Sequence, residues 1–172
     1  MTTAHRYTLA SRPTGMPLDE NFTYKTIEIP SISDGQVLVE AQWLSLDPYM
    51  RGRMSAAKSY APPIEIGAVI VGEFAGVIIE SKHSDFKVGE HVCCQGGWQD
   101  HAVVDGDEPS LHKVDASLLP LSAYLGVAGM PGRTAYFGLL EKGRPQEGET
   151  VVVSAASGAV GSVVGQIAKM KG

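Results

Sequence analysis

The stretch VVVSAASGAVGSVVGQIAKMKG, residues 151–172, carries the strongest fold signal in the sequence. Its three β-branched valines, Val151–Val153, are typical of a strand that is buried on both faces of a parallel sheet. Small residues follow at 154–158. Apolar residues then recur at helical spacing, namely Val160, Val163, Val164 and Ile167. The pattern predicts a strand, a tight turn and a helix, which together form half of a βαβ unit.

The turn has the spacing A-x-x-G-x-x-G, which suits the close approach of a pyrophosphate to backbone N–H groups at a helix start. We expect Ala155 to make the turn, Gly158 to permit phosphate approach and Gly161 to let the helix pack on the strand. A glycine-rich helix start that serves only packing is the alternative, because small-residue turns are common. The motif alone leaves both interpretations open.

The composition is that of a soluble globular protein, with 172 residues of which 44% are hydrophobic and 19% charged. The formal net charge is −5 and the 14 Lys and Arg residues are scattered. We therefore expect a small molecule as partner, and neither DNA nor an anionic membrane. No apolar run approaches the roughly 18 residues of a transmembrane helix, and the first residues lack the apolar centre of a signal peptide. A cytoplasmic location is predicted.

Short β-rich runs separated by turn residues extend from residue 6 to about residue 115 and predict a compact, partly open barrel. The candidate strands are RYTLA, YKTIEIP, QVLVEAQWLSLD, AVIVGEFAGVIIE, HVCCQ and LHKV. After Pro120 the pattern changes, with helical periodicity from Thr134 to Leu140. We expect a mainly β domain at residues 1–120 and the beginning of an α/β domain at residues 121–172.

A second stretch with chemical potential is LSLDPYMRGRM, residues 44–54. Asp47 and Pro48 are expected to turn the chain into a loop that carries Tyr49 and Arg51. A phenol can donate a proton or orient a carbonyl, and a guanidinium can bind anions. Packing with a satisfied hydroxyl is the alternative for Tyr49, and an ion pair or a loop anchor for Arg51. Tyr60, beside two prolines, either walls a cleft or is exposed loop.

The two cysteines, Cys93 and Cys94, are neighbours, and they are too few for a disulfide framework or a cysteine-based zinc site. A zinc site that combines them with His91 and His101 is an alternative. Adjacent residues of a strand point to opposite faces, which disfavours that site. We predict no bound metal.

The motifs LSLDPYMRGRM, GEFAGVIIES, FKVGEHV, GMPGRTAYFGLLE and VVVSAASGAVGSVVGQIAK, in this order, resemble the medium-chain dehydrogenase/reductase superfamily. The similarity is greatest to its zinc-independent branch of alkenal, prostaglandin and curcumin reductases, and it covers nearly the whole chain. It implies a GroES-like β domain followed by a Rossmann domain, with NADPH and substrate in the cleft between them. It also implies reduction of the C=C bond of α,β-unsaturated ketones or aldehydes by a homodimeric parent protein.

The resemblance also implies roles for individual residues. It places Pro48, Met130 and Thr134 near the nicotinamide. It places Tyr49 and Tyr60 in the substrate pocket, with Tyr49 as the catalytic group that holds the carbonyl oxygen or assists protonation. The turn beside the pyrophosphate would consist of Ala155, Gly158, Ala159, Val160 and Gly161.

The sequence departs from the zinc-dependent relatives at both of their ligand positions. They carry a cysteine in the loop occupied here by Leu46 and Asp47, and a Gly-His-Glu motif where this chain has Val71, Gly72 and Glu73. Neither ligand is present, which argues against alcohol oxidation through a zinc alkoxide.

A second departure is length, because family members continue for about as many residues again. A single strand with its helix cannot bury its apolar faces, and the residue that selects NAD or NADP falls beyond Gly172. We therefore expect the chain to be the N-terminal half of a reductase, inactive by itself. Two alternatives remain: quinone reduction with the same cofactor, and a non-catalytic module whose β barrel mediates assembly.

Overall fold

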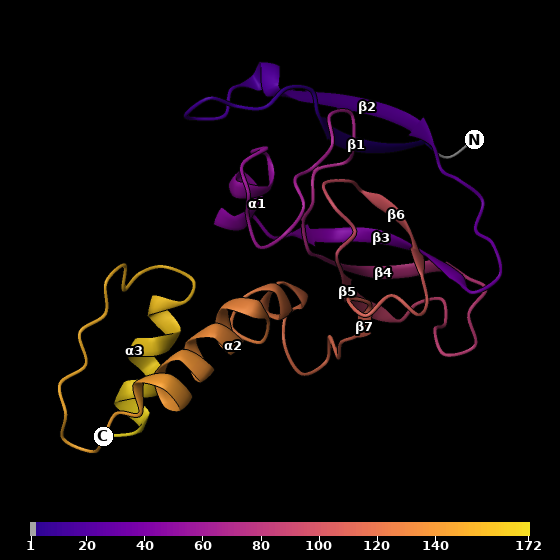
Figure 1. Cartoon of the computed structure of the whole chain (residues 1–172). Helices are drawn as coiled ribbons and strands as arrows, with labels where there is room; N and C mark the ends of the chain where they lie inside the picture. Colours follow the sequence, from indigo (N-terminus) through magenta and orange to yellow (C-terminus); the bar gives the residue numbers. More distant parts are fainter. Residues whose placement is uncertain (1–2) are drawn as a thin grey trace. The chain divides into compact units, whose positions relative to one another are not determined.

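The computed structural model describes residues 3–172. The chain divides into two compact units, Met1–Ala116 and Ser117–Gly172 (Figure 1). The regular elements described in the first unit are mostly strands, and those of the second are helices. The mainly β character predicted for the first part of the chain is confirmed.

The described part of the first unit contains two antiparallel sheets. A hairpin pairs β1 (Thr3–Leu9) with β2 (Phe22–Glu28) in continuous register. The larger sheet has the strand order β6-β3-β4-β5-β7. Its strands are β3 (Gln36–Leu44), β4 (Phe74–Ser81), β5 (His91–Cys94), β6 (His101–Asp105) and β7 (His112–Lys113). A 3-10 turn, η1 (Asp19–Asn21), precedes β2, and one short helix, α1 (Pro48–Arg53), follows β3.

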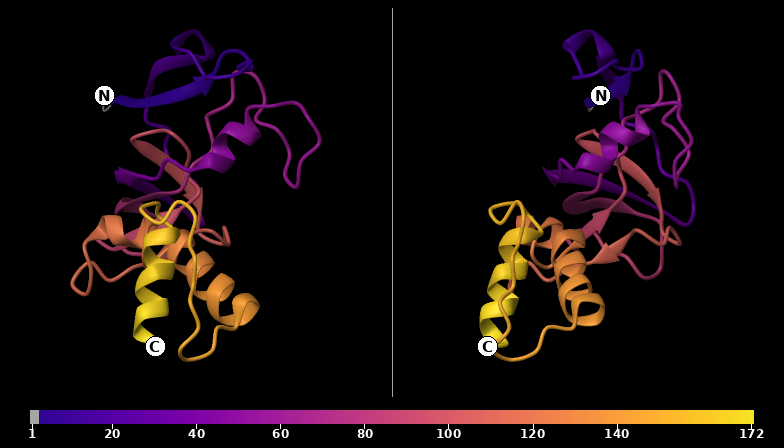
Figure 2. Two further views of the ribbon diagram at one scale, coloured as in Figure 1. Left: turned by 90° about the vertical axis from the view of Figure 1, so that its left-hand side faces the viewer. Right: turned by 60° about the vertical axis from the view of Figure 1, so that its left-hand side comes forward.

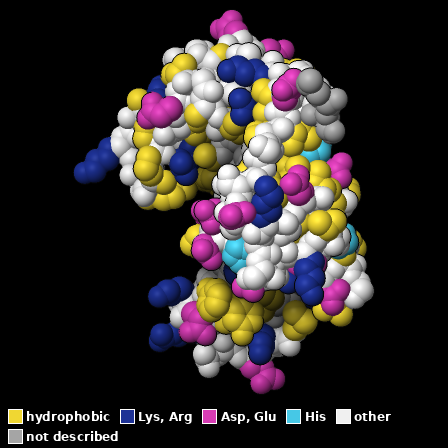
Figure 3. All heavy atoms as spheres, turned by 90° about the vertical axis from the view of Figure 1, so that its right-hand side faces the viewer, with side chains coloured by type: hydrophobic (Ala, Val, Ile, Leu, Met, Phe, Trp, Pro, Cys, Tyr) yellow, Lys and Arg dark blue, Asp and Glu magenta, His cyan; other side chains and the backbone are white. Residues whose placement is uncertain are grey.

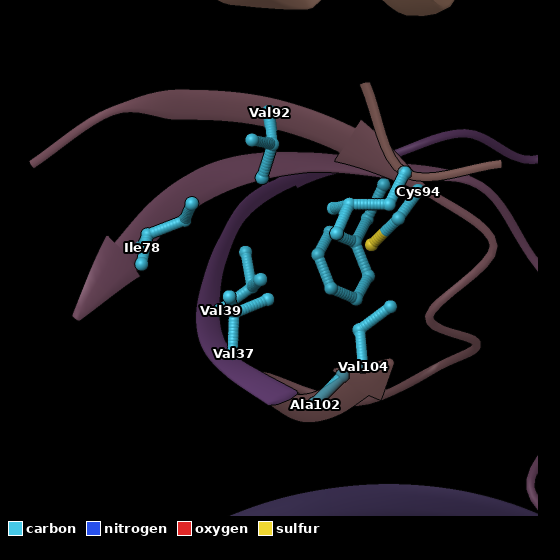
Figure 4. Close-up of a cluster of buried hydrophobic side chains, with 9 residues drawn as sticks. Val37, Val39, Ile78, Val92, Cys94, Ala102 and Val104 are labelled. Carbon is cyan, nitrogen blue, oxygen red and sulfur yellow. The ribbon is translucent and has the colours of Figure 1, made fainter. Parts of the chain in front are cut away.

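The core of the first unit lies against the larger sheet and consists of side chains from alternate strand positions. Figure 4 shows these side chains converging from β3, β4, β5 and β6: Val37, Val39, Ile78, Val92, Cys94, Ala102 and Val104. Phe74 and Leu111 complete the cluster. Each large apolar side chain that is fully buried stabilises a fold by roughly 1.5–3 kcal/mol. This cluster fixes β3, the strand before α1, and Met54 at the end of α1 packs in a second buried cluster with Leu9, Ile64 and Ile70.

Strand β6 is absent from the strands predicted from sequence. It follows a stretch rich in turn residues, and only Ala102 and Val104 of its five residues are buried. Its place is set instead by pairing with β3, from Gln36↔Asp105 to Glu40↔His101. Such long-range pairing is not visible in a local pattern.

The second unit consists of helices joined by irregular segments. They are the 3-10 helix η2 (Leu121–Leu125), α2 (Met130–Tyr136), the π-helix η3 (Phe137–Gly143) and α3 (Gly161–Met170). Helices α2 and α3 lie side by side, and a long loop connects η3 to α3 (Figure 2).

The strand predicted at Val151–Val153 is not formed. These residues lie in the irregular connection before α3, and Val152 is 91% exposed. A parallel strand needs neighbouring strands to satisfy its backbone N–H and C=O groups, and residues 117–172 provide none. The expected Rossmann sheet is therefore absent from the described residues, and only the turn and the helix of the predicted pattern are present.

The surface is mixed in character. On the face drawn in Figure 3, charged side chains of both signs are scattered among hydrophobic patches. Within residues 3–172, no helix combines the length and the apolar character that crossing a membrane requires.

Candidate functional site

Tyr49 lies on α1, which begins where a loop was expected. Pro48 occupies the first helical position, and Asp47 precedes it in an extended conformation. The Ser45 hydroxyl donates a hydrogen bond to Oδ2 of Asp47 at 2.6 Å. Pro at the first position suits a helix because its missing N–H would have no intrahelical acceptor there. A helix of six residues has too few turns to produce a periodic pattern, which explains why the sequence indicated a loop.

The phenol of Tyr49 is half-buried and oriented by a hydrogen bond. Its hydroxyl donates to Oε1 of Gln95 at 3.3 Å, and the backbone N–H of Gln95 donates to Ser110 Oγ at 3.1 Å. Burial raises the pKa of Tyr49 above its usual value, and the negative charges of Asp47 and Glu73 add to the effect. The phenol is therefore protonated at neutral pH and available as a hydrogen-bond donor.

The inner face of α1 is held by sulfur–aromatic packing. Met50 and Met54 are both 3% exposed, and the indole N–H of Trp98 donates to the Met50 sulfur at 3.4 Å. Gly72 leaves room for this packing, because a Cβ there would lie 2.9 Å from Trp98 and 3.1 Å from Met50. Sequence reasoning missed these supports, because Gly72 and Trp98 lie far from Tyr49 in the chain.

Arg51 anchors α1 to the loop that contains Pro13 and Gly15. Its guanidinium donates to the carbonyl oxygen of Pro13 at 3.0 Å and to that of Gly15 at 2.8 Å. Of the three roles left open for this side chain, which were anion binding, an ion pair and a loop anchor, the loop anchor is the one observed.

Tyr60 lies in the loop after α1 and is 84% exposed. Among residues 3–172 its hydroxyl has no hydrogen bond to Tyr49 or to any other side chain. Its assignment to a substrate pocket stays a prediction.

The glycine turn of the second unit folds around one carbonyl group, that of Ala155. The N–H of Gly158 donates to this oxygen at 2.9 Å, and Ala155 itself has a φ of 51°. A Cβ at Gly161 would overlap the same carbonyl, whereas a Cβ at Gly165 would meet nothing within 4 Å. The second glycine of the motif therefore serves close backbone packing within the turn.

The same turn leaves donors available at the start of α3. In the part of the chain that the structure describes, the N–H groups of Ala159, Val160 and Gly161 donate to no backbone carbonyl. The side chains from Ser154 to Gly158 are small, and Ala159 and Val160 are exposed, whereas Gly161 is buried. Uncommitted N–H groups at the positive end of a helix attract anions such as phosphate.

Met130 and Thr134 both belong to α2 and are exposed, Met130 by 37%. The glycines around them have a packing role. A Cβ at Gly129 would overlap the Tyr124 carbonyl, and one at Gly132 the Val127 carbonyl. The motif GMPGRTAY thus lets η2 and α2 meet closely while Met130 and Thr134 remain accessible.

The cysteine pair belongs to the core. Cys93 and Cys94 are adjacent on β5 and both are buried. Burial raises the pKa of the Cys94 thiol to about 12, so this group is neither a thiolate nucleophile nor a ready metal ligand. No group of three or more His, Cys, Asp or Glu side chains within residues 3–172 is arranged to hold a metal ion.

Comparison with known proteins shows which family the chain belongs to. Residues 5–114 match a family described as the N-terminal domain of oxidoreductase. The chain belongs to the medium-chain dehydrogenase/reductase superfamily. Within it, the similarity lies with the curcumin and prostaglandin reductases, which confirms the resemblance inferred from the motifs.

Two curated relatives and one solved structure illustrate the match. The chain is 50% identical over 167 residues to NADPH-dependent curcumin reductase from Escherichia coli (strain K12), covering 97% of this chain and 48% of that protein. It is 46% identical over 175 residues to prostaglandin reductase 1 from Bos taurus, covering 100% and 50%. The structure of CurA in complex with NADPH from Vibrio vulnificus is 50% identical, with a TM-score of 0.90, covering 98% and 49%. The chain thus spans about half the length of these relatives.

Proposed function

We propose that this chain forms the β domain and the first phosphate-binding turn of an NADPH-dependent oxidoreductase that reduces the C=C bond of α,β-unsaturated ketones or aldehydes. The observation that carries the proposal is the match to curcumin and prostaglandin reductases, which extends over 97% and 100% of the chain. Those proteins are about twice as long as this chain. The activity is therefore assigned to the complete reductase, and the residues of this chain are assigned to one part of its active site.

The residues present fit NADPH at the glycine turn. Three uncommitted N–H groups at the start of α3, beside small side chains, provide donors for a pyrophosphate. We assign pyrophosphate contacts to Ala155, Gly158, Ala159, Val160 and Gly161, and nicotinamide contacts to Pro48, Met130 and Thr134. When bound, NADPH supplies a hydride, which carries one proton and two electrons to the β-carbon of the alkene.

Tyr49 is the group that we assign to the substrate carbonyl. Negative charge moves onto the carbonyl oxygen as the β-carbon gains the hydride, and a donor aimed at that oxygen stabilises the enolate. Tyr49 suits this role because it is protonated, half-buried and fixed by Gln95. The second hydrogen arrives as a proton at the α-carbon, from Tyr49 or from water, and restores the carbonyl. Tyr60 is assigned to the wall of the same pocket.

A chimaera tests the proposal. This chain replaces the matching residues of the curcumin reductase from Escherichia coli, and NADPH oxidation is followed with a simple enone, with a quinone and with NADH in place of NADPH. We expect enone reduction with NADPH. A folded chimaera that binds NADPH but leaves the enone intact would contradict the proposal, and turnover of the quinone alone would favour quinone reduction.

Within the chimaera, Tyr49→Phe is expected to lower turnover about 10²–10³-fold, the usual effect of losing one donor to a developing oxyanion. NADPH affinity should change little, because the contacts assigned to the pyrophosphate are backbone N–H groups of the glycine turn and do not involve the phenol. Tyr24→Phe, at an exposed residue assigned to neither the cofactor nor the substrate, is the matched control for the loss of a hydroxyl. An unchanged rate in Tyr49→Phe would remove Tyr49 from the mechanism.

A further inference from the structure

A pocket of about 370 Å³ lies in the first unit, and none of the residues assigned above to cofactor or substrate lines it. Its volume is within the usual range of small-molecule sites. The walls come from β1, β2, the end of β3 and the segment before β6, and four of the eleven lining residues are tyrosine or tryptophan. The side chains that matter here are His5, Tyr7, Tyr24, Trp43, Trp98 and Asp100.

The rings of the pocket support one another. Tyr24 stacks on the His5 ring with centroids 5.5 Å apart, and Tyr7 lies 5.1 Å from Tyr24 and meets Trp98 edge-on at 6.4 Å. Much of this aromatic surface is exposed, by 56% for Tyr24 and 54% for Trp43. Because the faces of aromatic rings carry negative potential, a hollow lined by several of them attracts cations.

Asp100 places a carboxylate in the same lining. Its Oδ1 accepts the backbone N–H of His5 at 2.8 Å and lies 3.0 Å from Nδ1 of His101, while Oδ2 lies 2.8 Å from Nδ1 of His5. Partial burial works against the charged form, but the His5 N–H and the two imidazoles outweigh it and lower the pKa of Asp100. A carboxylate has about four lone-pair sites, so acceptor capacity remains for a ligand.

The side chains that pair with this carboxylate are the imidazoles of His5 and His101, which carry a positive charge only when protonated. None of the described residues that form the pocket is a lysine or an arginine. We propose that the pocket binds an organic ammonium ion with an aromatic body, the ring packing among Tyr7, Tyr24 and Trp43 and the ammonium group facing Asp100. The pocket is proposed to bind a cation, whereas the substrates proposed for the reductase are neutral carbonyl compounds. This proposal does not depend on the proposed reductase function.

Intrinsic fluorescence provides the test, because the chain has two tryptophans and both line this pocket. The 172-residue chain is titrated at about pH 8, where histidine side chains are ordinarily neutral. The probes are three molecules of similar size and opposite or no charge: 2-phenylethylammonium, 2-phenylethanol and 3-phenylpropionate. We expect saturable quenching with the ammonium bound about tenfold more tightly than the alcohol, and with the anion weakest.

Two variants separate the charge from the rings. Asp100→Asn preserves the size of the side chain and should reduce the preference for the ammonium over the alcohol to about onefold, with the alcohol's affinity unchanged. Asp85→Asn removes an equal charge outside the pocket and is the matched control. Tyr24→Leu keeps both tryptophans and an apolar wall, and should weaken the ammonium about threefold or more through loss of the ring face.

Circular dichroism of each variant checks that the first unit is folded. If Asp100→Asn does not fold, the affinity of Tyr24→Leu for the ammonium probe decides whether the pocket binds it. Equal affinities for the three probes, tightest binding of 3-phenylpropionate, or no saturable change in the wild type would each overturn the proposal. An Asp85→Asn variant that loses the preference as fully as Asp100→Asn would also overturn it, because the attraction would then be a property of net charge alone.

Discussion

The two units of the chain bury their apolar side chains to very different degrees. In the first, residues of the β3–β6 strands close a core in which Phe74, Ile78 and Val92 are 0% exposed. In the second, the buried hydrophobic residues are Leu121, Leu125, Ala135 and Leu139. Val127, Tyr136, Phe137, Val152 and Met170 are each at least half exposed there. Antiparallel strands find their partners within the first unit, whereas the parallel strand expected at Val151–Val153 has no partner in the second.

The second unit has an uncovered apolar groove, which lowers its expected stability relative to the first unit. A groove of about 480 Å³ runs between α2 and α3, lined by apolar side chains that include Tyr136, Phe137 and Ile167. Such surface contributes to stability only when something covers it. We therefore expect the first unit to unfold cooperatively and the second to open at a much lower free energy.

The largest effect is expected from a cavity in the first core. Phe74→Ala removes a ring that is 0% exposed and should lower the free energy of unfolding of the first unit by about 3–5 kcal/mol. Urea unfolding followed by circular dichroism measures this change. Val88→Ala, at a position 65% exposed, is the control and should stay within about 0.5 kcal/mol of the wild type. A small loss in Phe74→Ala would mean that the core is not the source of stability.

Two glycine substitutions test the second unit, and their expected effects on stability are smaller than that of Phe74→Ala and opposite in sign to each other. Gly161→Ala forces a Cβ against the Ala155 carbonyl and should destabilise the turn by about 1–3 kcal/mol. Gly165→Ala, one turn later on α3, meets nothing within 4 Å and should stabilise the helix by about 0.5–1 kcal/mol. Hydrogen exchange of the α3 amides measures both changes. Equal shifts in the two variants would contradict the packing around Ala155.

The sequence predicted those parts of the fold that local patterns control. Runs of β-branched and apolar residues between turn residues predicted strands such as β3 and β4, and the helical repeat of Val160, Val163 and Ile167 predicted α3 correctly. Strand β6 was missed, and the strand predicted at Val151–Val153 is not formed. In each case the outcome depends on partner strands far away in the sequence, whose presence or absence no local pattern reports.

The candidate site shows the same limit. Tyr49 stood out in the sequence as a phenol next to a turn, but its acceptor Gln95 is 46 residues away and was not anticipated. The glycines of the turn were expected to admit a phosphate or to pack, and Gly161 is seen to pack against Ala155. A motif identifies residue types that suit a chemistry, whereas the contacts that tune them come from the tertiary fold.

The smallest expected effect concerns Tyr49, which the first unit fixes and partly buries. Its pKa is raised, so the native state keeps the phenolic proton at pH values where the unfolded chain has lost it. The native state then binds more protons than the unfolded state, and the free energy of unfolding must fall as the pH rises past about 10. Below that pH the contribution is fully present. The absorbance of tyrosinate, compared between the wild type and Tyr49→Phe, should show one step at higher pH than free tyrosine.

The unfolding free energy provides the second measurement. Between about pH 9 and about pH 11 the wild type should lose more stability than Tyr49→Phe, because only the wild type releases this proton on unfolding. Tyr60→Phe removes the same hydroxyl from a ring that is 84% exposed and accounts for the loss of any tyrosine. Parallel pH slopes in the wild type and Tyr49→Phe would mean that α1 leaves the phenol open to water. Tyr49 would then lack the partly buried environment that distinguishes the first unit and that its proposed role requires.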